Sequence, residues 1–345
     1  MRCCYLFRRS ATRSRLLCVV AGAVATVASM VAPNYAGIVT FGSGTNTFNL
    51  EFVTIGNAGN TADEDTNARP LNAGSVGYTY AIGKFEVSEG MIANYNSNFG
   101  TANGLAINTT SRGTNRPATN VSWNEAARFV NWLNTSTGNH VAYKFTTSGV
   151  NDNIVLWTSE DAGYNASNPY RNSLAKYVLP SYNEWYKAAF YNPSNSAYYD
   201  FANGSNTRPT AVTGGTEPNT AVYTRTGEAS PTGPADVDQA GGLSPYGVMG
   251  LNGNVREWEE SSFDLTNSSS SSSRGVRGGD WLNDSSFLFL QSRGSNAPSI
   301  EINRLGFRVA SITSSAAAIP EPTSMAIFGL SALCIAYRAR RNSKS

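Results

Sequence analysis

The stretch Gly247-Val248-Met249-Gly250-Leu251-Asn252-Gly253-Asn254-Val255-Arg256-Glu257-Trp258 places glycine and asparagine turn residues directly before an acid and a large aromatic residue. Glycine and asparagine accept the backbone conformations that tight turns require. Two similar short blocks follow, Arg277-Gly278-Gly279-Asp280-Trp281 and Leu305-Gly306-Phe307-Arg308-Val309. Gly, Asn, Ser, Thr and Tyr are abundant and few segments show a helical period, which predicts a loop-rich α+β domain with short strands.

Three segments upstream carry helix signals. Ser122-Trp123-Asn124-Glu125 and Ser181-Tyr182-Asn183-Glu184 have the form of a capping box, in which serine and glutamate each bond a free backbone N–H at the start of a helix. A shorter helix is expected from Ser88 to about Ser97. Residues 49 to 55 alternate as a strand does, and residues 78 to 87 indicate a further strand element. The Ser268 to Ser273 run is expected to be a surface loop within a single domain, not a linker.

The N-terminal end is expected to direct export. Residues 1 to 15 contain five arginines and no acid, and an apolar run follows from residue 16 to residue 32. That order is typical of a secretory signal peptide, which we assign to residues 1–36. A retained N-terminal membrane anchor is the alternative, and either interpretation carries the main domain out of the cytoplasm.

The C-terminal end carries a second targeting pattern. Pro320-Glu321-Pro322 precedes an apolar stretch at residues 325 to 337, and the bases Arg338, Arg340 and Arg341 follow. This order resembles the PEP-CTERM sorting signal of Gram-negative bacteria, here residues 320–345, which implies an exosortase-type processing peptidase as a partner. It also implies a membrane contact through the C-terminal helix before processing, and a final place in the cell envelope or extracellular matrix. A plain tail anchor is the alternative.

The central region, residues 37–319, is acidic and lacks cysteine. It holds 17 of the 26 Lys+Arg and 23 of the 24 Asp+Glu, a net charge of −6, because nine bases and Glu321 lie in the two ends. A nucleic-acid partner would need a surplus of bases, so none is expected. The cysteines lie only in the ends, at Cys3, Cys4, Cys18 and Cys334, and His140 is the single histidine. Thiolate and histidine-rich sites are therefore hard to build.

Six blocks in order carry a family resemblance. The three blocks above combine with Ile82-Gly83-Lys84-Phe85-Glu86-Val87-Ser88, with residues 117 to 123, and with Leu179-Pro180-Ser181 leading to Glu184-Trp185. They resemble the formylglycine-generating enzyme family, also called sulfatase-modifying factors, over nearly all of residues 37–319. The resemblance implies a compact, loop-rich fold distantly similar to C-type lectins.

The resemblance also implies bound calcium. Calcium takes six to eight oxygen ligands and accepts backbone carbonyls from a tight glycine turn. This chain has Gly250 where the family often offers an Asn or Asp side chain. A structural carboxylate satisfied by backbone amides is the alternative for the glutamate of the turn. The implied ligands are Gly253, Val255 and Glu257 for one ion, and Asn219 and the carbonyl of Thr220 for a second.

Copper is not expected. Active family members hold copper(I) with two cysteines after the Arg-Gly-Gly block, and soft thiolates are the ligands that this ion prefers. The first of these positions corresponds to Asn283 here, and the second falls near Leu288. Because the domain has no cysteine, we expect no oxidation of a substrate cysteine. His140 is expected to be an incidental surface residue.

We therefore expect a non-catalytic domain that binds a glycan, a peptide or another envelope component, such as an extracellular polysaccharide or an envelope protein. Trp281, Asn283 and Arg293 are the candidate ligand contacts, because they lie where the family's substrate groove would be. Arg277 and Arg308 are expected to bridge loop carbonyls instead. Two enzymatic alternatives remain, an active oxidoreductase of the family type and a hydrolase that uses paired carboxylates. The acids available for the second are Glu257, Glu259, Glu260, Asp264, Asp280 and Asp284.

Overall fold

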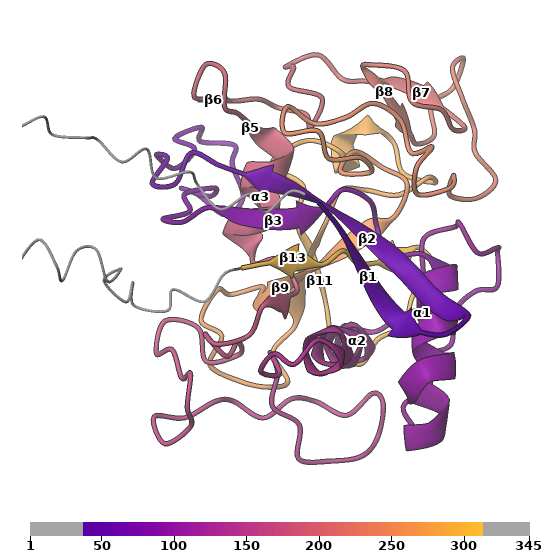
Figure 1. Cartoon of the computed structure of the whole chain (residues 1–345). Helices are drawn as coiled ribbons and strands as arrows, with labels where there is room; N and C mark the ends of the chain where they lie inside the picture. Colours follow the sequence, from indigo (N-terminus) through magenta and orange to yellow (C-terminus); the bar gives the residue numbers. More distant parts are fainter. Residues whose placement is uncertain (1–36, 313–345) are drawn as a thin grey trace, which may run out of the picture. The chain divides into compact units, whose positions relative to one another are not determined.

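The computed structural model describes residues 37–312, and both predicted targeting segments lie outside this range. The chain opens with an antiparallel hairpin of β1 (Gly37–Ser43) and β2 (Asn46–Ile55), which crosses the front of the molecule in Figure 1. Strand β3 (Tyr80–Gly83) continues the sheet antiparallel to β2. The strand expected at residues 49 to 55 is confirmed and begins at Asn46, whereas the element expected at residues 78 to 87 is shorter.

Two short strands complete this first sheet and join distant parts of the chain. β13 (Ala310–Ser311) lies between β3 and β4 (Tyr177–Val178) and pairs antiparallel with both, which gives the order β1-β2-β3-β13-β4. The last described strand is therefore an interior strand of the sheet that the first strands begin. This closure ties the N-terminal hairpin to the C-terminal blocks of the sequence.

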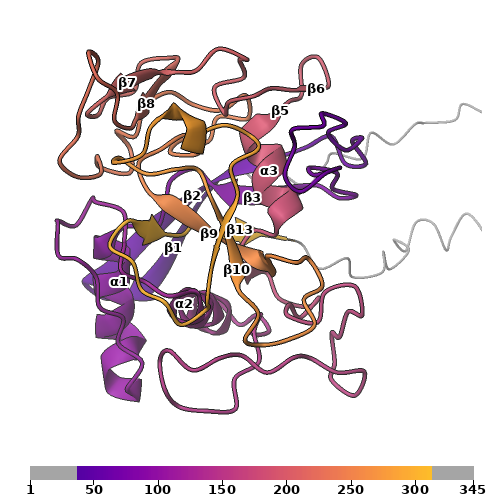
Figure 2. The ribbon, with the colours of Figure 1, turned by 180° about the vertical axis from the view of Figure 1, so that it is seen from behind.

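A second sheet has the order β11-β10-β9-β12, and its strand β9 begins directly after the glycine and asparagine turn residues quoted at the outset. β9 (Arg256–Ser262) pairs antiparallel with β10 (Arg274–Arg277) and parallel with β12 (Leu305–Gly306), and β11 (Gly294–Asn296) forms the edge. Figure 2 shows β9 and β10 near the centre of the molecule. Two small ribbons, β5 (Tyr191–Asn192) with β6 (Ala197–Tyr198) and β7 (Thr210–Val212) with β8 (Thr220–Val222), complete the described strands.

The predicted helices are confirmed. α2 (Trp123–Ser136) and α3 (Tyr182–Phe190) each begin with a complete capping box, at Ser122 and Ser181. α1 (Glu89–Tyr95) is capped by Ser88 and runs on into a π-helical turn, η1 (Asn96–Gly100), and a 3-10 turn, η2 (Thr101–Asn103). In Figure 1, α2 and α3 lie on opposite sides of the central strands β9 and β13. A further 3-10 turn, η3 (Ser285–Phe287), follows β10, and the serine run at residues 268 to 273 is a loop as expected.

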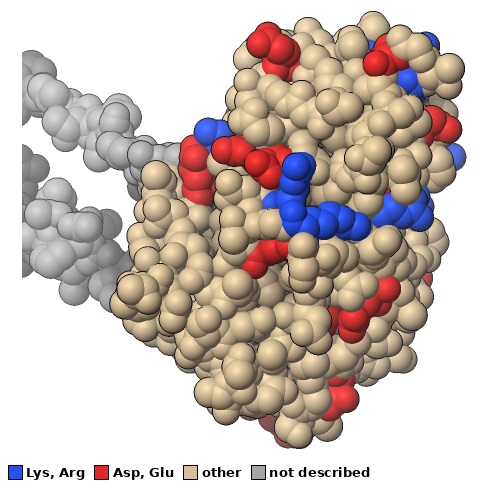
Figure 3. Space-filling model, turned by 90° about the vertical axis from the view of Figure 1, so that its right-hand side faces the viewer, with Lys and Arg blue, Asp and Glu red and all other residues tan. Residues whose placement is uncertain are grey.

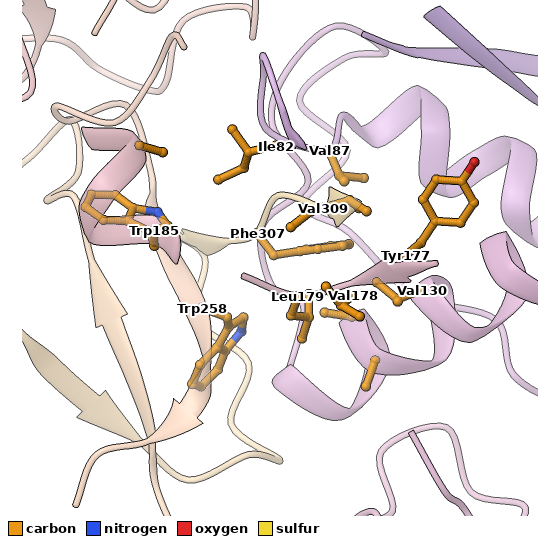
Figure 4. Close-up of a cluster of buried hydrophobic side chains, with 14 of the residues drawn as sticks. Ile82, Val87, Val130, Tyr177, Val178, Leu179, Trp185, Trp258, Phe307 and Val309 are labelled. Carbon is orange, nitrogen blue, oxygen red and sulfur yellow. The ribbon is translucent and has the colours of Figure 1, made fainter. Parts of the chain in front are cut away.

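The core is built from aromatic side chains whose polar atoms are satisfied. Trp185, Trp258 and Phe307 are fully buried and meet in the cluster shown in Figure 4. The indole Nε1 of Trp258 donates to the carbonyl of Val121 at 2.9 Å, and that of Trp123 donates to the carbonyl of Glu259 at 2.9 Å. A buried indole N–H left without an acceptor would be costly, so these bonds fix the helix α2 against β9. No helix within residues 37–312 is long and apolar enough to cross a membrane.

Candidate functional site

Strand β9 carries three glutamates that are fully buried, and each is paired with arginine. Glu257, Glu259 and Glu260 have no exposed surface. Glu259 accepts from Arg277 Nε at 2.6 Å and from Arg293 Nε at 2.8 Å, and Glu260 Oε1 accepts from Arg171 Nε at 2.9 Å. A buried charge persists only when a partner and hydrogen bonds offset its loss of water. The buried ion pairs of these acids therefore link β9 to distant segments of the chain.

Glu257, the predicted calcium ligand, has both carboxylate oxygens engaged. Arg308 donates to Oε1 and Oε2 at 2.6 Å each, and the indole Nε1 of Trp185 donates to Oε2 at 2.7 Å. Arg308 also donates to the carbonyls of Gly83 and Met249 at 2.8 Å, which confirms its predicted role as a bridge between loops. Arg277 likewise donates to loop carbonyls, at 3.2 Å and 3.3 Å. What the sequence did not reveal is that each of these arginines also neutralises a glutamate of β9.

A further buried acid, Glu86, lies beside the glycine turn. Its Oε1 accepts from Asn254 Nδ2 at 3.0 Å, and its Oε2 has no hydrogen-bond partner within the described residues. A Cβ at Gly250 would lie 2.5 Å from Glu86 Oε1, so the absence of a side chain there admits this carboxylate. Burial raises the pKa of Glu86 to about 8, with the nearby Glu257 adding to the rise and Arg308 opposing it.

The calcium proposal can be tested against these contacts. The unpartnered Oε2 of Glu86 is an oxygen of the kind that calcium takes, although Glu86 is not among the predicted calcium ligands. Glu257, in contrast, is fully engaged by Arg308. The residues therefore fit a cation only in part, with Glu86 as the available carboxylate. No group of three or more His, Cys, Asp or Glu within residues 37–312 is arranged to hold a metal.

The other predicted calcium ligands are held by backbone geometry. Gly253 has a φ of 81°, and a Cβ there would lie 2.2 Å from the carbonyl oxygen of Val222. Val255 is fully buried in a small cluster with Trp281. At the second predicted ion, Asn219 has a φ of 60° and the carbonyl of Thr220 accepts from Gly242 N at 2.9 Å. Calcium binding by either set stays a prediction.

The three predicted ligand contacts are engaged with the protein itself. Trp281 is 3% exposed and Asn283 is 9% exposed. Asn283 Oδ1 accepts from Arg256 Nη2 and from the backbone N of Asp280, both at 3.0 Å, so it fixes the turn from residue 280 to residue 283. The Arg293 side chain is 4% exposed and lies on Glu259. Direct ligand contact by these three side chains stays a prediction, and in the described arrangement each would first have to leave its partners.

Three arginines surround the Asp280–Asn283 turn at the surface. The Arg112 guanidinium lies 4.8 Å from the centre of the Trp281 ring, and Arg256 and Arg304 approach Asp280 at 3.3 Å and 3.4 Å. The side chains of Arg256 and Arg304 are 29% and 35% exposed, whereas that of Asp280 is 1% exposed. Leu282, at the tip of the turn, is 54% exposed. Figure 3 shows that basic side chains gather in a band across one face of the molecule.

The residues at the thiolate positions of the family have structural surroundings. Asn283 fixes the turn as described, and Leu288 is 1% exposed in a cluster with Phe201 and Tyr223. His140 lies exposed on the loop after α2, as expected. The acids proposed for hydrolysis are also occupied: besides those of β9, Asp264 accepts from Ser262 Oγ at 2.6 Å, and Asp284 caps η3.

Comparisons with known proteins agree with this architecture. The profile of the sulfatase-modifying factor enzyme 1-like domain matches residues 37–312, and that of the PEP-CTERM protein-sorting motif matches residues 318–341. Treponema denticola variable protein 1 is similar in structure, with a TM-score of 0.55 and 20% identity over 79% of this chain and 98% of that one. CarF is also similar, with a TM-score of 0.51 and 16% identity over 76% and 98%. These structures share the fold alone, and no curated protein matches the chain.

Proposed function

Because the chain belongs to the sulfatase-modifying factor enzyme 1-like domain family and ends in a PEP-CTERM sorting motif, we propose that it is an exported, non-catalytic binding protein of the cell envelope. The sorting motif indicates export and processing by an exosortase-type peptidase. The ligand we propose is an anionic envelope component, an acidic polysaccharide or an acidic protein segment. The observation that carries this proposal is the group of three arginines around the Asp280–Asn283 turn.

The chemistry of the turn supports a binding role. Arg256 and Arg304 pair with Asp280, and Arg112 lies against the Trp281 ring, so three arginines meet one acid of the turn. Guanidinium groups bind carboxylates and phosphates through paired hydrogen bonds and lose little entropy because the group is planar. The exposed Leu282 adds apolar contact area between them. Arginine is enriched among the residues that dominate binding energy at interfaces.

The residues available for catalysis support a non-catalytic role. Residues 37–312 contain no cysteine to hold copper(I), and the positions that correspond to the family's thiolates are Asn283 and Leu288. A carboxylate hydrolase needs one ionised and one protonated acid facing the substrate. Glu257, Glu259 and Glu260 are buried and paired with arginine, so none of these three acids faces a substrate.

Binding of acidic polymers by the full-length chain tests this proposal. Alginate and poly-glutamate are titrated at low and at moderate ionic strength. Exposed charge pairs are screened by salt, so the affinity should fall as salt rises. We expect the double substitution Arg112→Gln with Arg304→Gln to weaken binding by at least about tenfold, since each charged hydrogen bond contributes roughly 1.5 kcal/mol or more. Arg69→Gln is the matched control, because this residue is exposed and its guanidinium bonds the carbonyls of Thr66 and Ala68 within its own loop.

Two outcomes would contradict the proposal. If the wild type, the double variant and the control bind the polymers with equal affinity, Arg112 and Arg304 do not contribute to binding. Oxidation of a cysteine-containing peptide by the full-length chain after copper loading would show catalysis and reject the non-catalytic role. Which of the two acidic polymers binds decides between a polysaccharide and a protein segment as the ligand.

A further inference from the structure

A cavity with a volume of about 580 Å³ opens where the first turn of α3 meets the loop before it and the loop after β9. Its size lies within the range of cavities that hold small ligands. Neither the three arginines of the Asp280–Asn283 turn nor Trp281, Asn283 or Arg293 lines it. The side chains that matter for its chemistry are Tyr78, Asn168, Arg171, Tyr182, Asn183 and Asn267.

Buried ion pairs hold one wall of this cavity rigid. Arg171 donates to both oxygens of Glu184, at 2.9 Å and 2.8 Å, and also bonds Glu260. The Tyr78 hydroxyl donates to Glu184 Oε1 at 2.6 Å. Asn168 Nδ2 donates to Glu260 at 3.3 Å. In turn, Asn168 Oδ1 accepts from Asn267 Nδ2 at 2.9 Å. Side chains fixed in this way lose little entropy when a ligand binds.

Other lining groups have hydrogen-bonding capacity to spare. Asn183 Oδ1 accepts from Gly74 N at 2.7 Å, which fixes the amide and leaves Nδ2 without a partner among residues 37–312. The hydroxyl of the half-buried Tyr182 also has no partner in that range. Asn165, at the rim, accepts from Ser167 N through Oδ1, so its Nδ2 is likewise directed to no described residue. An amide offers two donors and one acceptor oxygen, and a tyrosine hydroxyl can both donate and accept.

Charges of both signs lie at the wall of the cavity. Arg171 is the charged residue among those that line it, its side chain is 8% exposed, and the carboxylates of Glu184 and Glu260 both pair with its guanidinium. Burial raises the pKa of Glu260 to about 7, although Arg171 opposes the rise. An anionic ligand would therefore meet carboxylates behind the guanidinium, and a cationic ligand would meet Arg171 itself. Neutral polar ligands face neither penalty.

We propose that this cavity binds a neutral carbohydrate, at a site separate from the arginine-lined turn. Adjacent hydroxyl groups of a sugar both donate and accept, as the lining amides and hydroxyls do. The partly exposed rings of Tyr78 and Tyr182 offer flat apolar surfaces against the C–H faces of a sugar ring. The site does not depend on the anionic ligand proposed for the turn, so each can be tested without the other.

Calorimetric titration of the full-length chain with maltohexaose, cellohexaose and mannohexaose tests the assignment. We expect saturable binding of at least one of them. Asn183→Asp keeps the acceptor for Gly74 N and removes the free donor, so it should weaken binding by about tenfold. Tyr182→Ala should weaken it by at least as much, and Tyr182→Phe should separate the contribution of the hydroxyl from that of the ring. Tyr199→Ala is the matched control, a half-buried tyrosine outside the cavity.

The outcomes separate this site from the proposed function. Loss of neutral-sugar binding in the Tyr182 and Asn183 variants, with alginate or poly-glutamate binding unchanged, supports the site. Neutral-sugar binding that is equal in all variants would place it elsewhere and overturn the assignment. If none of the three sugars binds, while the acidic polymers still do, the cavity is a water-filled hollow only and the proposed function stands. A circular dichroism spectrum of each variant shows that it is folded.

Discussion

The substitution Glu86→Gln should make the protein more stable at pH 8 and remove part of the pH dependence of its stability. Burial raises the pKa of Glu86 from 4.5 to about 8. Between these values the folded state keeps a proton that the unfolded state has released, so the free energy of unfolding falls as the pH rises. Below pH 4.5 both states hold the proton and the effect vanishes. The two pKa values differ by about 3.5 units, which corresponds to a loss of at most about 5 kcal/mol in the free energy of unfolding.

Urea denaturation at pH 5, 6, 7 and 8 measures this contribution. Glutamine keeps an oxygen that accepts from Asn254 Nδ2, so the main contact of the side chain survives. We expect the stability difference between Glu86→Gln and the wild type to grow with pH, to several kcal/mol at pH 8. Glu64→Gln, at an exposed acid, is the matched control and should follow the wild-type profile. Equal slopes in the wild type and Glu86→Gln would refute the reasoning.

The same variant tests the calcium proposal. A cation bound to the unpartnered Oε2 of Glu86 would favour the ionised carboxylate and reverse the loss of stability at high pH. Calcium should then raise the melting temperature of the wild type at pH 8 and leave that of Glu86→Gln unchanged. A melting temperature of the wild type that does not respond to calcium or to chelation would remove calcium from this turn.

Two further substitutions probe the structure around the turn. Arg308→Met should lower the free energy of unfolding by about 3–5 kcal/mol, because it leaves the buried Glu257 carboxylate without its cation, whereas Arg225→Met at an exposed arginine should stay within about 0.5 kcal/mol. Urea denaturation at pH 7 checks both, and a loss below 1 kcal/mol in the first would show that the pair is dispensable. Gly253→Ala should cost more than Gly247→Ala, although both glycines have positive φ, because a Cβ meets a carbonyl oxygen at 2.2 Å in the first and nothing within 4 Å in the second. The second should cost about 1–2 kcal/mol, and equal losses would mean that the strand near Gly253 can move aside.

The local elements of the fold could be predicted because their causes are local. A capping box links residues three positions apart, so Ser122 and Ser181 located two helices from the sequence alone. The strands β4, β12 and β13 are only two residues long and exist through pairing with distant segments. No hydrophobic period can develop over two residues, so the sequence does not predict these strands. The closure of the first sheet depends on them and could not be predicted either.

Side-chain partnership was the part of the site that sequence could not supply. Arg308 lies 51 residues from Glu257 along the chain, and nothing in the intervening sequence marks them as partners. Glu86 likewise reaches the space beside Gly250 from the loop between β3 and α1, far away along the chain. The cavity beside α3 was missed altogether, since its asparagines and tyrosines come from segments around residues 78, 168, 182 and 267. The sequence shows that asparagine and tyrosine are abundant, but it does not show that these particular residues meet at one cavity.

The net charge of −6 does not set the sign of the charge on every face of the domain. The buried glutamates of β9 are matched by arginines, so the excess of acids lies elsewhere in the domain. A ligand at the surface responds to the exposed charges nearest to it, because water and salt screen the others within about 10 Å. The arginines around the Asp280–Asn283 turn therefore attract anionic groups locally, whatever the sum over the domain. The negative total still argues against a nucleic acid, which would need a surplus of bases along an extended surface. The turn is thus suited to a few acidic groups on a ligand that also contacts apolar surface, such as Leu282.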